Sequence, residues 1–202
     1  MTILFVCSGN TCRSPLAVAA WRALDDEVND EPGSKEASQS GTLAQTSSEI
    51  EVASAGLAAS HGNAATRFAQ QIARSWKVDL SAHRSRPLRQ RLARDSDLVV
   101  AMTQNQARSA RAQFGLPSHR VRVLGEFANY RVLDNPLNSA ARSEEQRLAA
   151  LLNQDEATEI DNDIDIDDPF GASLEAYESC AARIRLSVKG LRRALREGEV
   201  AL

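Results

Sequence analysis

The chain has 202 residues, of which 43% are hydrophobic and 25% charged, and its formal net charge is −3. This composition excludes a wholly disordered chain, and the near-neutral charge argues against a protein that coats nucleic acid. There is no run of about 18 uninterrupted apolar residues, so no membrane span is expected. The start lacks a basic leader, so we expect a cytoplasmic protein. In that reducing compartment the three cysteines do not predict a disulfide framework.

The first predicted elements are a strand, a tight loop and a helix. Residues 2–6 form a β-branched and aromatic run, which is typical of a strand buried on both faces. Ser14 and Pro15 then open a helix, because a proline is well placed at the first helical position. The polar residues 29–50 that follow predict a long irregular insertion.

The middle of the chain alternates strands with helices. A helix is predicted over residues 65–76, where large apolar residues recur at every third or fourth position. Thr103 and Gln106 predict a capping box at the start of another helix. Three further strands are predicted, at residues 50–53, 97–102 and 120–124.

The last part of the chain holds an irregular, increasingly acidic stretch at about residues 134–166. It is followed by the clearest helix of all, over residues 174–195, in which apolar residues alternate steps of three and four. Strands that alternate with helices indicate an α/β fold, with a parallel sheet covered on both faces. We therefore expect one domain with two insertions, at about 29–50 and 134–166.

The chemistry is concentrated in the first loop, which reads Cys7-Ser-Gly-Asn-Thr-Cys-Arg-Ser-Pro15. A loop between a strand's carboxyl end and a helix's amino end points several backbone N–H groups at one anion. Gly9 lets the backbone approach that anion closely, and Arg13 adds a planar fork that holds two phosphate oxygens. The same positive field stabilises a thiolate at Cys7, which is then a nucleophile aimed at phosphorus. A lone cysteine after a strand would instead be read as a small buried hydrophobe.

A phosphate ester or amide also needs an acid that protonates its leaving group. Asp168 is the candidate, because Pro169 biases it toward an extended conformation that can hold the carboxyl over a site. Asp167 is an adjacent competitor for this role.

These motifs, together with Ser54-Ala-Gly56, residues 97–103 and Asp168-Pro-Phe-Gly171, resemble the low-molecular-weight protein-tyrosine phosphatase family. The resemblance is greatest to its bacterial protein-arginine phosphatase branch. It implies a three-layer, flavodoxin-like fold with a four-stranded parallel sheet. It also implies a phosphorylated protein as substrate, with no metal or other cofactor and with neither nucleic acid nor membrane as partner.

The resemblance also implies roles for individual residues. Cys7 would form a phosphocysteine, Arg13 would hold the phosphoryl oxygens, and Asp168 would act first as acid and then as base. Ser14 would donate a hydrogen bond to the Cys7 thiolate. The phosphate-binding loop would comprise Ser8, Gly9, Asn10, Thr11, Cys12 and Ser14, and the network that braces it would comprise Asn10, Ser54 and His83.

The second loop cysteine, Cys12, matches one that in part of this family pairs reversibly with the nucleophile and shields it from over-oxidation. A small residue that fills the underside of the loop is an equally good interpretation. Cys180 falls on the last predicted helix and is expected in the core.

The substrate class rests on a few positions. Thr11 stands where phosphotyrosine enzymes of the family often have a bulky aliphatic residue, and where the arginine-directed branch has threonine. Only one aromatic, Phe170, follows Asp-Pro and would form a substrate wall, while Leu57 and Ala58 occupy positions where another aromatic is expected. The resemblance therefore favours phosphoarginine. Phosphotyrosine is the alternative, and a non-catalytic anion-binding or redox-sensing module is the alternative of another class.

Overall fold

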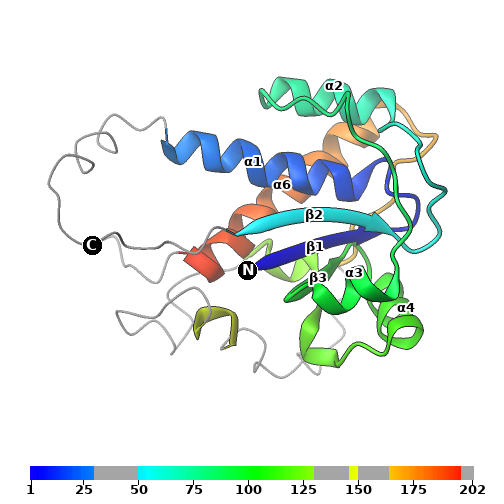
Figure 1. Ribbon diagram of the computed structural model, residues 1–202. Coiled ribbons are helices and arrows are strands. Elements are labelled where there is room, and N and C mark those ends of the chain that lie inside the picture. The colour runs from blue at the N-terminus through cyan, green and yellow to red at the C-terminus, as the bar shows by residue number, and fades with distance from the viewer. Residues whose placement is uncertain (30–49, 130–145, 150–163, 197–202) are drawn as a thin grey trace, which may run out of the picture.

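The computed structural model describes residues 1–29, 50–129, 146–149 and 164–196, which form three layers (Figure 1). The central layer is a four-stranded parallel sheet with the strand order β2-β1-β3-β4. Its strands are β1 (Thr2–Cys7), β2 (Glu51–Gly56), β3 (Leu98–Ala101) and β4 (Val121–Val123). The predicted fold class and all four predicted strands are confirmed, with boundaries that differ by one to three residues.

Strand β1 is buried on both of its faces, as its continuous apolar sequence predicts. Ile3 and Phe5 point into one hydrophobic cluster, and Leu4 and Val6 point into another on the opposite side of the sheet. The strand is therefore the centre of two cores at once, which fixes the position of the loop that leaves it.

Helices cover both faces of the sheet. Figure 1 shows α1, α2 and α6 on one face and α3 and α4 on the other. Their bounds are α1 (Arg13–Asn29), α2 (Arg67–Ser75), α3 (Gln90–Asp95), α4 (Gln104–Phe114) and α6 (Leu174–Arg196). Two short 3₁₀ turns, η1 (Ser118–Arg120) and η2 (Leu124–Phe127), flank β4. Within the described residues, no helix is long and apolar enough to span a bilayer.

Some local predictions differ from the structure. Helix α1 begins at Arg13, two residues before Pro15, which nevertheless lies in the first turn, where amide hydrogens have no helical partner. Helix α3 was not predicted, because a helix of six residues shows too little periodicity. Most of the two predicted insertions lies outside the described residues. The part that is described includes a helical turn at 146–149 and residues 164–166, which belong to no helix or strand.

The strand order determines where the functional loops meet. The chain leaves β1 toward α1 on one face of the sheet, and it leaves β3, the neighbouring strand, toward α4 on the opposite face. Parallel α/β sheets bind ligands at such a switch point, because the diverging connections leave a crevice at the carboxyl ends of the two strands. The loop that begins after Cys7 lies at this point.

Close packing between α6 and η2 requires a glycine. A Cβ on Gly190 would overlap the backbone carbonyl of Phe127. Alanine is intrinsically the better helix former, by about 1 kcal/mol. At this position, however, the overlap prevents that gain.

We therefore expect Gly190→Ala to destabilise the protein. The overlap should outweigh the gain in helix propensity by about 2 kcal/mol and lower Tm by roughly 4–8 °C in thermal denaturation. Ser179→Ala is the matched control, because Ser179 is an exposed residue of the same helix. Its Tm should stay within about 2 °C of that of the unmodified chain. A Gly190→Ala variant as stable as the unmodified chain would contradict this account of the packing.

Candidate active site

The loop of residues 8–12 curls between the carboxyl end of β1 and the amino end of α1. Asn10 has a left-handed backbone conformation (φ 54°), which asparagine tolerates better than most residues. Gly56, at the end of β2, lies so close to the loop that a Cβ on it would be 2.5 Å from the Ser8 carbonyl oxygen. The Ser-Ala-Gly motif therefore ends in glycine because the loop backbone occupies the space of a side chain.

The thiol of Cys7 lies at the floor of this loop and is 2% exposed. Its sulfur is 3.1 Å from the Ser14 hydroxyl oxygen, and it accepts a hydrogen bond from the Asn10 backbone N–H at 3.2 Å. The amino end of α1, where backbone N–H groups have no helical partner, lies behind the loop. The structure thus places Ser14 where the resemblance implied it.

The buried side chain of Asn10 is the centre of the bracing network. Its Nδ2 donates to the hydroxyls of Ser14 and Ser54, each at 2.9 Å, and its Oδ1 accepts from the Arg86 backbone N–H at 2.9 Å. All the polar atoms of this buried amide are therefore paired. Arg86 is a further member that the sequence did not indicate: its backbone N–H pairs with Asn10, and its side-chain Nε donates to the Ser54 carbonyl oxygen at 2.9 Å. With His83, described next, the three implied members of the network do come together.

His83 contacts the same loop from the α2–α3 connection. Its Nε2 lies 2.7 Å from the Asn10 carbonyl oxygen, and since a carbonyl only accepts, this nitrogen carries the proton. Burial lowers the pKa of His83 below its ordinary value of 6.5, and the charges of Arg84 and Arg86 act in the same direction. The hydrogen bond to Asn10 opposes this shift. His83 is therefore a neutral donor at neutral pH.

Arg13 connects the loop to the segment that carries Asp168. One terminal nitrogen of its buried guanidinium donates to the Ile166 carbonyl oxygen at 2.9 Å. The other donates to Asp168 Oδ2 at 2.5 Å, although the two residues are 155 positions apart in the chain. The sequence predicted both side chains as functional, but not this ion pair.

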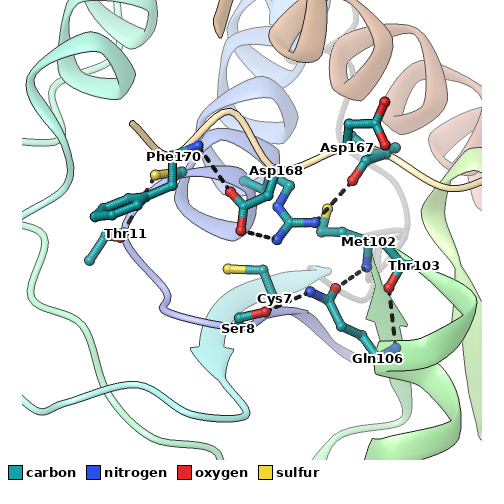
Figure 2. Close-up of polar contacts among 12 residues, drawn as sticks. Cys7, Ser8, Thr11, Met102, Thr103, Gln106, Asp167, Asp168 and Phe170 are labelled. Carbon is teal, nitrogen blue, oxygen red and sulfur yellow. Dashed lines mark hydrogen bonds and ion pairs between the residues drawn. The ribbon is translucent and has the colours of Figure 1, made fainter. Parts of the chain in front are cut away.

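The structure distinguishes Asp168 from its neighbour Asp167. In Figure 2 the carboxylate of Asp168 points toward Cys7, whereas that of Asp167 points away from it. Asp168 Oδ1 also accepts from the Phe170 backbone N–H at 3.2 Å, which holds the carboxylate in a turn. Asp168 thus faces the loop, and Asp167 contributes to this region only a carbonyl, which accepts from Cys180 Sγ at 3.6 Å.

A cavity of about 500 Å³ opens above the loop. Its floor is formed by loop residues, its far side by Asp168 and Phe170, and its remaining wall by the segment 58–66. Phe170 is 70% exposed, so its ring stands at the mouth of the cavity. The lining residues are Cys7, Ser8, Gly9, Thr11, Cys12, Ala58, Ser60, Asn63, Ala64, Thr66, Asp168 and Phe170.

Cys12 lies under the loop and contacts a tyrosine that the sequence did not indicate. Its sulfur is 3.2 Å from the Tyr177 hydroxyl and 3.6 Å from the Thr66 hydroxyl. Burial raises the pKa of Tyr177 to about 12, and its ring packs edge-on against Phe68, so the hydroxyl is a fixed neutral group. Both interpretations of Cys12, guard and filler, remain predictions.

Cys180 is confirmed as a core residue. It belongs to the hydrophobic cluster on the α1 and α6 side of the sheet. Burial raises the pKa of its thiol to about 12, so it stays protonated. Among the described residues, no group of three or more histidine, cysteine or acidic side chains is placed to hold a metal ion.

The predicted capping box at α4 is only half formed. The Thr103 hydroxyl accepts from the Gln106 backbone N–H at 3.2 Å, as a box requires. The Gln106 side chain does not return to Thr103. Instead, it bonds the backbone N–H of Met102 at 3.2 Å and the hydroxyl of Ser8 at 3.0 Å (Figure 2). The Thr103–Gln106 capping motif did not predict this contact with Ser8.

Comparison with known proteins identifies the family. The sequence model of the family described as low molecular weight phosphotyrosine protein phosphatase matches residues 41–154. The chain is 32% identical to the protein-arginine-phosphatase of Bacillus subtilis over 127 residues, which cover 63% of this chain and 72% of that protein. It is 31% identical over 151 residues to a probable low molecular weight protein-tyrosine-phosphatase, EpsP, of Ralstonia solanacearum, covering 74% and 88%.

Solved structures agree with this result. One is the YwlE arginine phosphatase, in a cysteine-to-serine mutant with a phosphorylated active-site serine. It is 25% identical with a TM-score of 0.66, and 98% of this chain and 97% of that one are covered. The YwlE arginine phosphatase from Geobacillus stearothermophilus is also 25% identical, with a TM-score of 0.63 and coverages of 96% and 92%. The chain therefore belongs to the low molecular weight phosphotyrosine protein phosphatase family, and it is a protein phosphatase.

The buried neutral His83 makes stability depend on pH. Because its native pKa lies below 6.5, the unfolded chain binds a proton at a higher pH than the native protein does. The stability from the neutral form is fully present above pH 6.5 and is lost as pH falls from there toward the native pKa. We expect Tm to fall over this range, and to fall less in His83→Gln, whose amide donates without titrating. Parallel Tm curves for the two proteins between pH 7.5 and 5 would contradict the assignment.

Proposed function

We propose that the chain hydrolyses phosphoarginine side chains of proteins through a phosphocysteine intermediate on Cys7. In the first step the Cys7 thiolate attacks phosphorus, and the bond from phosphorus to the leaving nitrogen breaks. Arg13 and the loop amides hold the three equatorial oxygens, whose charge they stabilise in the transition state. Asp168 gives its proton to the departing guanidine.

In the second step Asp168, now a carboxylate, takes a proton from a water molecule that attacks the phosphocysteine. The P–S bond breaks, inorganic phosphate leaves, and the thiolate and the protonated Asp168 are regenerated. The contact between Arg13 and Asp168 fits this sequence, because a bound phosphate dianion competes for the same guanidinium. Substrate binding thereby frees the carboxyl to carry the proton that the leaving group needs.

The side chains that line the cavity are the main support for phosphoarginine as the substrate. Thr11 places a hydroxyl, which accepts hydrogen bonds from a guanidinium, where a bulky aliphatic side chain would favour an aromatic ring. Apart from the loop, Asp168 and Phe170, the wall consists of small or polar side chains: Ala58, Ser60, Asn63, Ala64 and Thr66. Such a wall offers no second flat surface to enclose a tyrosine ring. The arginine phosphatases among the relatives support the same substrate class.

Phosphotyrosine is the second candidate. It is favoured by the exposed ring of Phe170 at the mouth of the cavity, on which a substrate ring can stack. The tyrosine phosphatases among the relatives point to the same substrate.

The assignment of the acid predicts a sharp difference between two neighbouring residues. Asp168→Asn should lower kcat for phosphorylated peptides by about 10²- to 10⁴-fold, because the amide cannot protonate the leaving group. Asp167→Asn removes the same charge one position earlier and should retain kcat within about twofold. Steady-state kinetics of both variants, beside an inactive Cys7→Ser control, decide the matter. Equal losses in the two aspartate variants would reject Asp168 as the acid.

The substrate assignment is tested with matched phosphoarginine and phosphotyrosine peptides. The unmodified chain should have the higher kcat/KM for phosphoarginine, and Thr11→Ile should lower that preference by about tenfold or more. The reason is that isoleucine removes the acceptor for the guanidinium and adds an apolar contact for a ring. Thr66→Val is the control, since it also replaces a hydroxyl that lines the cavity. A preference for phosphotyrosine in the unmodified chain would establish the second candidate instead.

A further inference from the structure

The side chain of Gln106 connects α4 to the phosphate-binding loop, which lies on the other side of the switch point. It is 8% exposed, and its amide lies between the Met102 backbone N–H and the Ser8 hydroxyl. Met102 is only four positions from Gln106, but Ser8 lies 98 positions before it in the chain. The contact exists because β1 and β3 are neighbouring parallel strands, so the residues that follow them meet.

The chemistry of the neighbours fixes the orientation of this amide. A backbone N–H only donates, so the atom of Gln106 that faces Met102 must be the oxygen, Oε1. The nitrogen, Nε2, then faces Ser8 and donates to its Oγ at 3.0 Å. The Ser8 oxygen is thus an acceptor in this bond, and its own proton stays available for another partner.

The position of Ser8 allows its hydroxyl proton to reach a ligand in the cavity. Its side chain is exposed and lines the cavity beside Cys7 (Figure 2). Among the described residues, the bond from Gln106 is the one hydrogen bond that Ser8 Oγ makes. An O–H group held in this way meets the oxygens of a phosphoryl group bound over the loop.

We propose that Gln106 is a positioning residue for Ser8. It holds the serine oxygen as an acceptor, so that the serine hydroxyl donates to an oxygen of the bound phosphoryl group. The inference rests on the proposed function only in placing that group over Cys7, and it does not depend on which side chain bears the phosphate.

The Gln106 side chain also connects the phosphate-binding loop to the segment that carries Asp168. Met102, whose N–H donates to Gln106, accepts from the Ile166 N–H at 2.8 Å through its carbonyl oxygen. Ile166 in turn accepts from Arg13 and lies two residues before Asp168. The backbone of Met102, at the end of β3, is therefore bonded to the segment that carries Asp168. Gln106 links the same backbone to Ser8 in the loop.

The test is a double-mutant cycle with p-nitrophenyl phosphate as substrate and inorganic phosphate as competitive inhibitor. Gln106→Leu keeps the size of the side chain and removes both hydrogen bonds. Ser8→Ala removes the hydroxyl. Each single variant should lower kcat/KM by about three- to tenfold and raise the inhibition constant for phosphate by a similar factor, as expected for one lost hydrogen bond. The double variant should have a kcat/KM no lower than that of the less active single variant, because Gln106 acts through Ser8.

Thr103→Ala is the matched control for a merely structural effect. It removes a different side-chain hydrogen bond at the start of α4, the one from the Gln106 backbone N–H to the Thr103 hydroxyl. It should lower Tm, as loss of a helix cap does, while kcat/KM and phosphate inhibition stay within twofold. A Gln106→Leu variant with unchanged phosphate inhibition, or losses that multiply in the double variant, would overturn the proposal. Activity that survives Cys7→Ser would instead reject the proposed function, so the two failures are distinguishable.

Discussion

The phosphate-binding loop depends on Asn10, whose side chain is fully buried beneath it. A loop that directs successive amides at one point cannot pair its own backbone groups, and here that geometry includes a left-handed residue. The side-chain amide of Asn10 supplies hydrogen bonds from outside the loop, to two serines and to the backbone of Arg86. The backbone carbonyl of Asn10 is paired with His83. Because all these groups are buried or half-buried, losing one leaves another unpaired, and this cost keeps the loop in a single shape.

The order of the strands gives this loop its neighbours. The chain diverges to opposite faces after β1 and β3, so α1 and α4 both begin at the same edge of the sheet, and the segment 164–168 fits between them. Ile166 is the key residue of that segment: it is fully buried, bonds Met102 through its N–H, and accepts from Arg13 through its carbonyl. This segment, which has no helix or strand of its own, is thereby fixed between the two by hydrogen bonds to its backbone.

The ion pair between Arg13 and Asp168 brings together the two side chains to which we assign phosphate binding and proton transfer. A buried guanidinium needs a counter-charge, and in this structure a half-exposed carboxylate supplies it. A phosphate dianion offers the same charge with better geometry for the guanidinium fork. In the proposed mechanism, the phosphoryl group and Asp168 therefore compete for one arginine.

The sequence by itself determined the class of fold, while the chemistry that it indicates for the first loop stays a prediction. The strand of residues 2–6, the Cys-x₅-Arg spacing and the last helix are local patterns, and each lies where it was predicted. The resemblance added Ser54 and His83, which the structure does place against the loop.

Only the tertiary structure decided which distant groups meet. Contacts between segments that are far apart in the chain place Tyr177 against Cys12, Arg86 against Asn10 and Asp168 against Arg13. Gln106 shows the reason most clearly. Its position in a capping motif satisfies every local rule, yet its side chain bonds Ser8, because the pairing of β1 with β3 brings a nonlocal partner within reach.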